Sequence, residues 1–248
     1  MRDQLALLLD DAAAGRFPPA DGGVTVLPQP SPRDAGVLSF TAHAVVFADV
    51  DPGWVAGELP ADDLGAPLSL PFLLSLCRAT GRRAGQVDVL CVTTPLPGPP
   101  PVDLTPETDP CHPRISRALR YRDEVRSWQT DGGLVSLGQG VAGRWEAAIE
   151  VDQARRGNGL GRRLAAAARH LVPPGTPLWA QIAPGNAASL RAFLAAGFVP
   201  VGAEVLLTVS TLTAAGARLA RPARPARAAS PARPARPVRP VRPARPAS

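Results

Sequence analysis

A loop with three alternating glycines, set between a strand and a helix, limits most strongly what this chain can fold into. Residues 145–151 (WEAAIEV) are typical of a strand, and the apolar residues in 160–172 recur at the spacing of one helix face. Gly157 and Gly159 lie between the two elements, and Gly161 stands at the start of the helix. A strand that leads through a short loop into an amphipathic helix predicts an α/β protein.

The same loop predicts an anion site. Glycines let the backbone approach a ligand closely, and the free amides and dipole of a helix N-terminus favour negative charge. Four arginines flank the loop: Arg155, Arg156, Arg162 and Arg163. We therefore expect a phosphate or pyrophosphate group to bind here.

Two common phosphate-binding loops are excluded by individual residues. A P-loop requires Gly-Lys-Ser/Thr, and this chain contains no lysine. A dinucleotide-binding loop requires a further glycine where Arg162 stands, and it belongs near the start of a parallel sheet. The expected ligand is therefore neither a P-loop nucleotide nor a dinucleotide.

The remaining pattern predicts a succession of short elements. We expect strands at 24–27, 37–50, 87–93, 124–130, 134–141, 178–182 and 199–209, and helices at 1–14, 71–80 and 115–121. Asp131, Gly132 and Gly133 predict a hairpin turn between two of the strands. Asn186 is the expected N-cap of a last helix, Gly197 follows its end, and Phe198 should fold back onto it.

Proline suggests where the chain divides. Eight prolines lie in residues 94–113, and this density is typical of a loop or linker because proline cannot donate to a strand ladder. The expected organisation is an N-terminal lobe at 1–95, a Pro-rich linker at 96–113, a core at 114–212 and a tail at 213–248.

Charge is distributed unevenly between the body and the tail. All 27 basic residues are arginines, and nine of them lie in 218–248, which contains no acid. Residues 1–217 hold 18 arginines and 21 acids, a net charge of −3, which argues against a basic nucleic-acid-binding domain. The Pro-Ala-Arg repeats predict a disordered tail. That tail either binds nucleic acid or another polyanion weakly, through charge alone, or is a low-complexity extension without a selected role.

Cysteine usage and hydropathy bear on cofactors and location. Cys77, Cys91 and Cys111 lack metal-ligand spacing and cannot all pair, so we expect no metal site, no disulfide scaffold and a reducing cytoplasm. The apolar run near the N-terminus is too short for a signal peptide, and we expect no membrane span.

Residues 156–161 (RGNGLG) fit the pattern Arg/Gln-x-x-Gly-x-Gly/Ala. Here the sequence resembles the GNAT family of acyl-CoA-dependent N-acetyltransferases, over about residues 120–208. A second family element follows at the expected distance, at 186–190 (NAASL) and 196–202 (AGFVPVG). The resemblance implies a GNAT-like α/β fold with a mixed, mostly antiparallel sheet flanked by helices.

The resemblance also implies that acetyl-CoA binds as a cosubstrate. The end of the strand would present backbone groups to the pantetheine arm, and the glycine loop would hold the pyrophosphate through its amides. Asn186 would lie near the pantetheine or its thiol, or would only cap its helix. The residues implied in cofactor binding are Ile149, Glu150, Val151, Arg156, Gly157, Asn158, Gly159, Leu160, Gly161, Arg162 and Asn186.

The implied reaction is direct attack by an amine on the thioester, which needs a base and a backbone amide that stabilises the oxyanion. Glu146 and Glu150 lie on one face of the strand, so each is either the base or an ordinary solvated or ion-paired residue. The family often has a tyrosine seven residues after the asparagine, as general acid to the thiolate. This chain has Phe193 there.

Two functions follow from these residues. The first is an N-acetyltransferase whose acceptor is a small-molecule or peptide primary amine, with an antibiotic, an amino acid, a polyamine and a protein amino group all open. The second is a catalytically silent acyl-CoA-binding or regulatory protein. The N-terminal lobe either supplies acceptor-binding helices or is a degenerate second copy of the fold, and a homodimer stays open.

Overall fold

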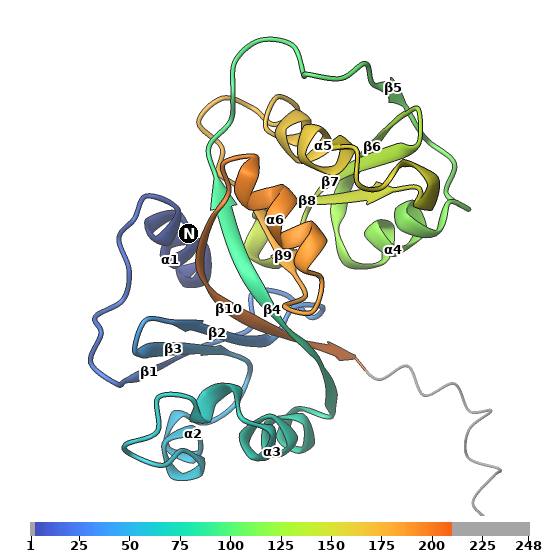
Figure 1. Ribbon diagram of the computed structural model, residues 1–248. Coiled ribbons are helices and arrows are strands. Elements are labelled where there is room, and N and C mark those ends of the chain that lie inside the picture. The colour runs from blue at the N-terminus through green and yellow to red at the C-terminus, as the bar shows by residue number, and fades with distance from the viewer. Residues whose placement is uncertain (1–2, 210–248) are drawn as a thin grey trace, which may run out of the picture. The chain divides into compact units, whose positions relative to one another are not determined.

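The computed structural model describes residues 3–209, which form one ten-stranded sheet flanked by helices (Figure 1). The strand order is β1-β3-β2-β10-β4-β9-β8-β7-β6-β5. Among these neighbours, β1–β3 and β8–β9 run parallel and the others run antiparallel. The predicted mixed, mostly antiparallel α/β class is confirmed. The tail predicted at 213–248 lies outside the described residues.

The strands are β1 (Val24–Leu27), β2 (Gly36–Phe40), β3 (His43–Phe47), β4 (Arg82–Thr93), β5 (Thr105–Pro106), β6 (Asp123–Thr130), β7 (Gly133–Gln139), β8 (Trp145–Val151), β9 (Leu178–Ile182) and β10 (Val199–Val209). The α-helices are α1 (Gln4–Ala13), α2 (Pro52–Glu58), α3 (Leu70–Thr80), α4 (Pro113–Tyr121), α5 (Leu160–Ala168) and α6 (Ala187–Ala195). Short 3-10 turns occur at η1 (Ala66–Leu68), η2 (Val141–Gly143) and η3 (Gln153–Arg155).

Several local predictions are confirmed because the turn chemistry fixes them. The β6–β7 hairpin turns at Asp131 and Gly132, and Gly132 has a φ of 76°. Asn186 caps α6 by accepting a hydrogen bond from the Ser189 amide at 3.1 Å. After α6, Gly197 has a φ of 88°, and Phe198 folds back so that its ring meets that of Phe193 edge-on.

One prediction for the N-terminal part is wrong, and one helix was not predicted. The single strand expected at 37–50 is a hairpin of β2 and β3, because Ala42 adopts a left-handed conformation with a φ of 52°. Helix α2 follows where no helix was expected. Asp51 caps it by accepting from the Trp54 amide at 2.8 Å, and Pro52 occupies its first turn, so the local signal was present.

Strand β4 joins the first and last parts of the described chain in one sheet. It pairs with β9 on one side and with β10 on the other, and β10 also pairs with β2. The Pro-rich residues that follow β4 form a loop against α5, where Arg169 Nε donates to the Thr94 carbonyl at 3.0 Å and the Leu96 amide donates to the Arg169 carbonyl at 2.9 Å. The domain boundaries near 95 and 113 stay a prediction.

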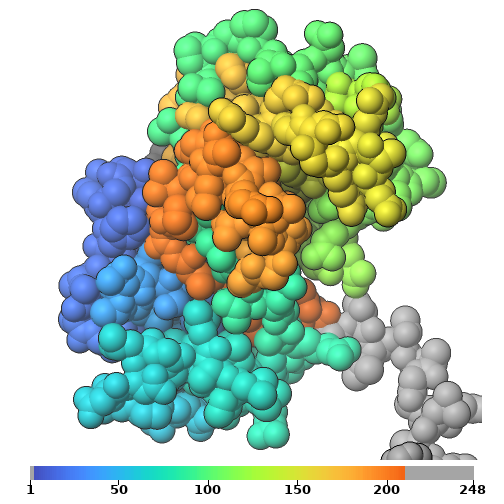
Figure 2. Space-filling view, in the orientation of Figure 1, coloured from blue at the N-terminus to red at the C-terminus, as the bar shows by residue number. Residues whose placement is uncertain are grey.

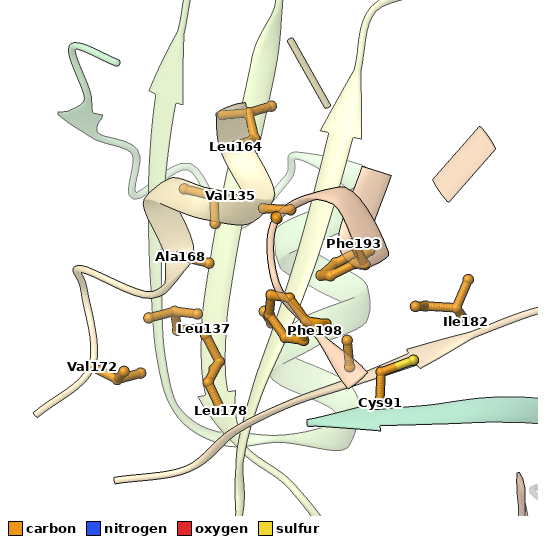
Figure 3. Packing of buried hydrophobic residues seen from close by; sticks show 14 of the residues in the cluster. Cys91, Val135, Leu137, Leu164, Ala168, Val172, Leu178, Ile182, Phe193 and Phe198 are labelled. Carbon is orange, nitrogen blue, oxygen red and sulfur yellow. The ribbon is translucent and has the colours of Figure 1, made fainter. Parts of the chain in front are cut away.

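Helices cover both faces of the sheet. Helices α5 and α6 lie side by side and cover one face of β4, β9, β8 and β7. Figure 2 shows their surfaces next to each other, in yellow and orange. Between them and the sheet, Leu164, Phe193 and Phe198 pack with Val135 and Cys91 (Figure 3). On the opposite face, α1 packs over β2, β3 and β4, and α4 packs against β6 and β7. Within residues 3–209, no helix is long and apolar enough to cross a membrane.

Candidate active site between β8 and β9

The two parallel strands β8 and β9 are joined at one end and separate toward the other. Their ladder consists of Trp145↔Leu178 and Glu146↔Trp179, whereas β8 pairs with β7 along its whole length. Beyond Glu146, the side of β8 that faces β9 therefore has no ladder partner within the described residues. In the antiparallel ladder with β7, alternate residues of β8 direct their backbone groups to β7, and the bond from the Asp152 amide to the Gly132 carbonyl places Ile149 and Val151 among the residues that direct theirs away from it. The Ile149 backbone and the Val151 amide are therefore left for a ligand, because such groups require partners.

The predicted pantetheine-contact residues lie at this opening. The side chains of Ile149 and Val151 pack toward α5 and α6, and Glu150 alternates to the opposite face. A Cβ placed on Gly161 would lie 3.6 Å from both Val151 Cγ2 and Ala192 Cβ. The absence of a side chain at Gly161 therefore leaves room where the start of α5 approaches β8 and α6.

The glycine loop ends at a helix N-terminus that no side chain caps. Gly157 and Gly159 have φ values of 83° and 75°, in the left-handed region that favours glycine. Gly159 is the N-cap of α5 and supplies no side-chain acceptor, and the loop from Asp152 to Gly159 is exposed. The amides of the first turn of α5 are thus free for an anion.

The arginines of the loop take different positions. Arg156 Nε donates to the Val151 carbonyl at 3.2 Å, and Arg163 Nη1 donates to the Asn158 carbonyl at 3.3 Å. Arg155 pairs with Asp131, whereas Arg162 is exposed on the first turn of α5. Leu160 is buried, so its side chain belongs to the core and only its amide faces the loop.

The second predicted element serves packing and capping in this structure. Asn186 caps α6 through its Oδ1 as described, and its side chain is exposed, so its place near the pantetheine stays a prediction. Phe193 stands at the position where the GNAT family often has a tyrosine. It is buried, with 3 % exposure, and the centre of its ring lies 4.8 Å from that of Phe198. Phe193 therefore belongs to the core under α6, and its ring has no proton to donate to a thiolate.

The two predicted bases have contrasting surroundings. Glu146 is 3 % exposed and binds Arg122 Nε at 2.7 Å and Arg144 Nε at 2.9 Å. Burial alone would raise the pKa of Glu146, but the two guanidinium groups outweigh it and hold the pKa below its ordinary value. Glu150 has a half-exposed side chain that accepts from Arg114 Nε at 3.0 Å. Of the two, Glu150 is the one that solvent or substrate can reach.

Glu146 belongs to a buried set of four charges beside the closed end of the opening. Arg144 Nη2 also binds Glu204 of β10 at 2.6 Å, and Gln181 of β9 donates to the same carboxylate. Burial raises the pKa of Glu204, and the charge of Arg144 offsets part of that rise. With Gln181, these four side chains connect β8, β9 and β10 where β8 and β9 begin to separate.

One carboxylate on the face of the sheet that carries α4 was not predicted from the sequence. Asp88 lies in β4 and alternates with Val89, which packs under α5 and α6, so its side chain points to the face that carries α4. Burial raises the pKa of Asp88, and a hydrogen bond from Gln86 and the charge of Arg117 offset part of that rise. The signal in the sequence was a single acid beside the apolar run 89–93.

A protein metal site requires several ligating side chains close together. Across residues 3–209, no group of three or more His, Cys, Asp or Glu side chains lies close enough together to hold a metal ion. Glu150 and Glu146 are instead bound to arginines, and Asp88 is bound to Gln86.

Comparisons with known proteins give partial likenesses. No protein-family model matches the chain, and no curated protein matches its sequence. Among solved structures, it is similar to a GNAT-family acetyltransferase from Colwellia psychrerythraea, with 11 % identity and a TM-score of 0.34 over 56 % of this chain and 62 % of that one. It is also similar to a GCN5-related N-acetyltransferase from Kribbella flavida, with 18 % identity and a TM-score of 0.37 over 56 % and 63 %. The chain thus spans less than two thirds of either structure.

Proposed function

We propose that this protein transfers an acetyl group from acetyl-CoA to a primary amine. The observation that carries the proposal is the separation of β8 from β9 beside the uncapped N-terminus of α5. Pantetheine carries amides along its length, and these pair with the Ile149 backbone and the Val151 amide, which point away from β7. The pyrophosphate at its other end binds the amides of residues 157–161, with the charges of Arg156 and Arg162 nearby.

The same arrangement supports the chemistry of direct transfer. The amine nitrogen attacks the thioester carbonyl, the C–N bond forms, and the C–S bond breaks to release the CoA thiolate. A backbone amide on the free side of β8 stabilises the oxyanion. Glu150 and Asp88 are the carboxylates able to take the amine proton, and the thiolate takes its proton from water because Phe193 has none.

A silent acyl-CoA-binding protein is the second candidate, and two observations favour it. Glu146 is sequestered by Arg122 and Arg144, and Phe193 replaces the expected acid. The two candidates differ in one measurement, the release of CoA thiol in the presence of amines. Release above the hydrolysis background supports the transferase, and its absence with acetyl-CoA bound supports the silent protein.

Binding of acetyl-CoA to the full chain tests the cofactor site directly. We expect Arg162→Glu to raise the dissociation constant about tenfold by calorimetry, which corresponds to about 1.4 kcal/mol. Arg78→Glu makes the same charge change at an exposed position on α3, and it should leave the constant within twofold. Equal effects of the two variants would show that the loop of α5 does not hold the phosphates.

A further inference from the structure

A hydroxyl, an imidazole and a carboxylate are joined in series at the edge of the sheet formed by β1. Thr25 Oγ1 of β1 lies 2.9 Å from His43 Nε2 of β3. His43 Nδ1 lies 2.9 Å from Asp21 Oδ1, in the loop before β1. A nucleophile, its base and a group that orients the base have this arrangement in hydrolases of several unrelated folds, so we call the three residues the triad.

The partners of His43 fix the direction of both hydrogen bonds. Asp21 accepts from His43 and, at 2.7 Å, from the Gly23 amide, and these two hydrogen bonds lower the pKa of Asp21, with the one from His43 having the larger effect. An ionised carboxylate can only accept, so the proton of the neutral ring lies on Nδ1, and Nε2 is an acceptor. Thr25 therefore donates its hydroxyl proton to His43, as a nucleophile does to its base.

The imidazole of the triad is enclosed, whereas its two partners are accessible. The His43 side chain is 7 % exposed, and the Asp21 side chain is 53 % exposed. Thr25 is partly exposed, on a strand whose other edge pairs with no strand of residues 3–209. A substrate can thus reach the hydroxyl while the surrounding protein and two hydrogen bonds hold the ring of the base.

The free edge of β1 also supplies an amide next to Thr25. The Leu27 carbonyl accepts from the Ala48 amide, so the backbone of Leu27 faces the side of β3. Backbone groups alternate between the two sides of a strand, so Val26 directs its amide to the free edge. In α/β-hydrolases, the amide that follows the nucleophile is one of the two oxyanion donors, and Val26 follows Thr25.

An exposed aromatic ring lies beside the triad. Phe40 of β2 is the direct cross-strand neighbour of His43, so the two side chains share one face of the sheet. Phe17 packs against Phe40 with ring centres 6.0 Å apart, and Phe17 is 48 % exposed. An exposed ring next to a nucleophile favours a substrate with an apolar group on its acyl side.

We propose that the triad is a second site, at which Thr25 takes the acyl group of a small carboxylic ester with an apolar acyl chain. Thr25 Oγ1 attacks the ester carbonyl and its proton passes to His43 Nε2. The C–O bond to the alcohol breaks, and the alcohol leaves with that proton. Water then attacks the acyl-threonine and gives a proton to His43, which returns it to Thr25 Oγ1 as the carboxylic acid leaves. Asp21 is a positioning residue that holds the tautomer of His43.

The test uses the full chain with p-nitrophenyl butyrate, and a fluorophosphonate as a covalent probe for activated hydroxyls. We expect hydrolysis above the buffer rate, and peptide mass analysis should locate the phosphonate on Thr25. Thr25→Val replaces the hydroxyl with a methyl group, so the rate should fall about a hundredfold, the lower range for catalysis by a positioned base, and the label should be lost. Thr25→Ser should retain both. Hydrolysis that Thr25→Val leaves unchanged, or no label on Thr25, would overturn the proposal.

Thr80 provides a matched control, because it is also partly exposed and its hydroxyl donates to the Leu76 carbonyl at 2.7 Å instead of to an imidazole. Thr80→Val should leave hydrolysis and labelling unchanged. Asp21→Asn no longer holds the proton on His43 Nδ1, so it should lower kcat about tenfold or more and leave KM within about twofold. Equal effects of Thr25→Val and Thr80→Val, or an unchanged kcat in Asp21→Asn, would overturn the assignment.

This inference is independent of the proposed acetyl-CoA site, because β3, β2, β10 and β4 lie between β1 and β9. Thr25→Val should therefore leave the acetyl-CoA dissociation constant unchanged. If the full chain binds acetyl-CoA and does not hydrolyse the ester, the triad is wrong and the proposed function stands. Weaker acetyl-CoA binding in Thr25→Val would overturn the claim that the triad is a second site.

Discussion

Glu146 of β8 faces Trp179 of β9 at the last position where these two parallel strands are joined. Beyond this pair the strands separate, and the free backbone of β8 leads to the N-terminus of α5. A strand edge and a helix N-terminus at opposite ends of one opening match a ligand with amides at one end and a pyrophosphate at the other.

Alanine variants of Gly159 and Gly143 distinguish a role of the loop in acetyl-CoA binding from the general cost of a side chain at positive φ. The two residues have φ values of 75° and 76°, and Gly143 lies in η2, away from the loop. Alanine at either position should lower stability by about 1–2 kcal/mol because of left-handed strain. Calorimetry with acetyl-CoA should show weaker binding for Gly159→Ala alone. Weaker binding in both variants would contradict a specific role for the loop.

Glu146→Gln tests the buried charges at the closed end of the opening. The change removes the carboxylate that Arg122 and Arg144 share and leaves buried positive charge without its partner. Urea unfolding at pH 7 should therefore show that the free energy of unfolding falls by about 3 kcal/mol. The folded pKa of Glu146 is lowered, so its stabilisation is present above the ordinary value of 4.5 and is lost as the pH falls below it. The difference between wild type and variant should therefore shrink in acid. A difference that grows in acid would contradict the ion pairs.

Glu150→Gln should separate function from stability. Its ion pair with Arg114 is partly exposed, and such pairs contribute about 0–1 kcal/mol, so the unfolding curve should change little. If Glu150 takes the amine proton, kcat should fall about tenfold or more, the lower range for a general base. Steady-state kinetics with a reactive amine checks this. Arg78→Glu, a charge change at an exposed position on α3, is the control. An unchanged kcat would leave Asp88 as the base.

The three cysteines should react in the order of their exposure. Burial raises the pKa of Cys91 to about 11, and its side chain packs in the core under α5 and α6, whereas Cys111 is exposed. A disulfide reagent at pH 8 should modify Cys111 first and Cys91 only after unfolding. Mass analysis of wild type and Cys111→Ser checks this order. Rapid modification of Cys91 in the folded protein would contradict its placement in the core.

Local features of the fold could be predicted from the sequence because neighbouring residues determine them. The β6–β7 turn, the Asn186 cap and the Gly197–Phe198 reversal each depend on residues a few positions apart. Strand β4 was expected at 87–93, but its place between β9 and β10 depends on pairings between residues 85 to 127 positions apart, which no local pattern contains.

In the candidate site, too, local features could be predicted from the sequence and contacts between distant elements could not. The glycine loop could be identified from residues 156–161 alone, since its conformation depends on the glycines themselves. The surroundings of Glu146 could not, because Arg122 reaches it from the end of α4 and Glu204 of β10 binds its other partner, Arg144. The ion pair between Arg114 and Glu150 likewise depends on how α4 packs over the sheet.

The most direct test of a CoA site between β8 and α5 is a thermal-shift measurement of the full chain with acetyl-CoA, CoA, ATP and NAD. A ligand that binds only the folded state stabilises it by about 2.7 kcal/mol at a hundredfold excess over its dissociation constant. The account predicts a higher melting temperature with acetyl-CoA and CoA, and no comparable rise with ATP or NAD. A cooperative transition that neither CoA species shifts would contradict it.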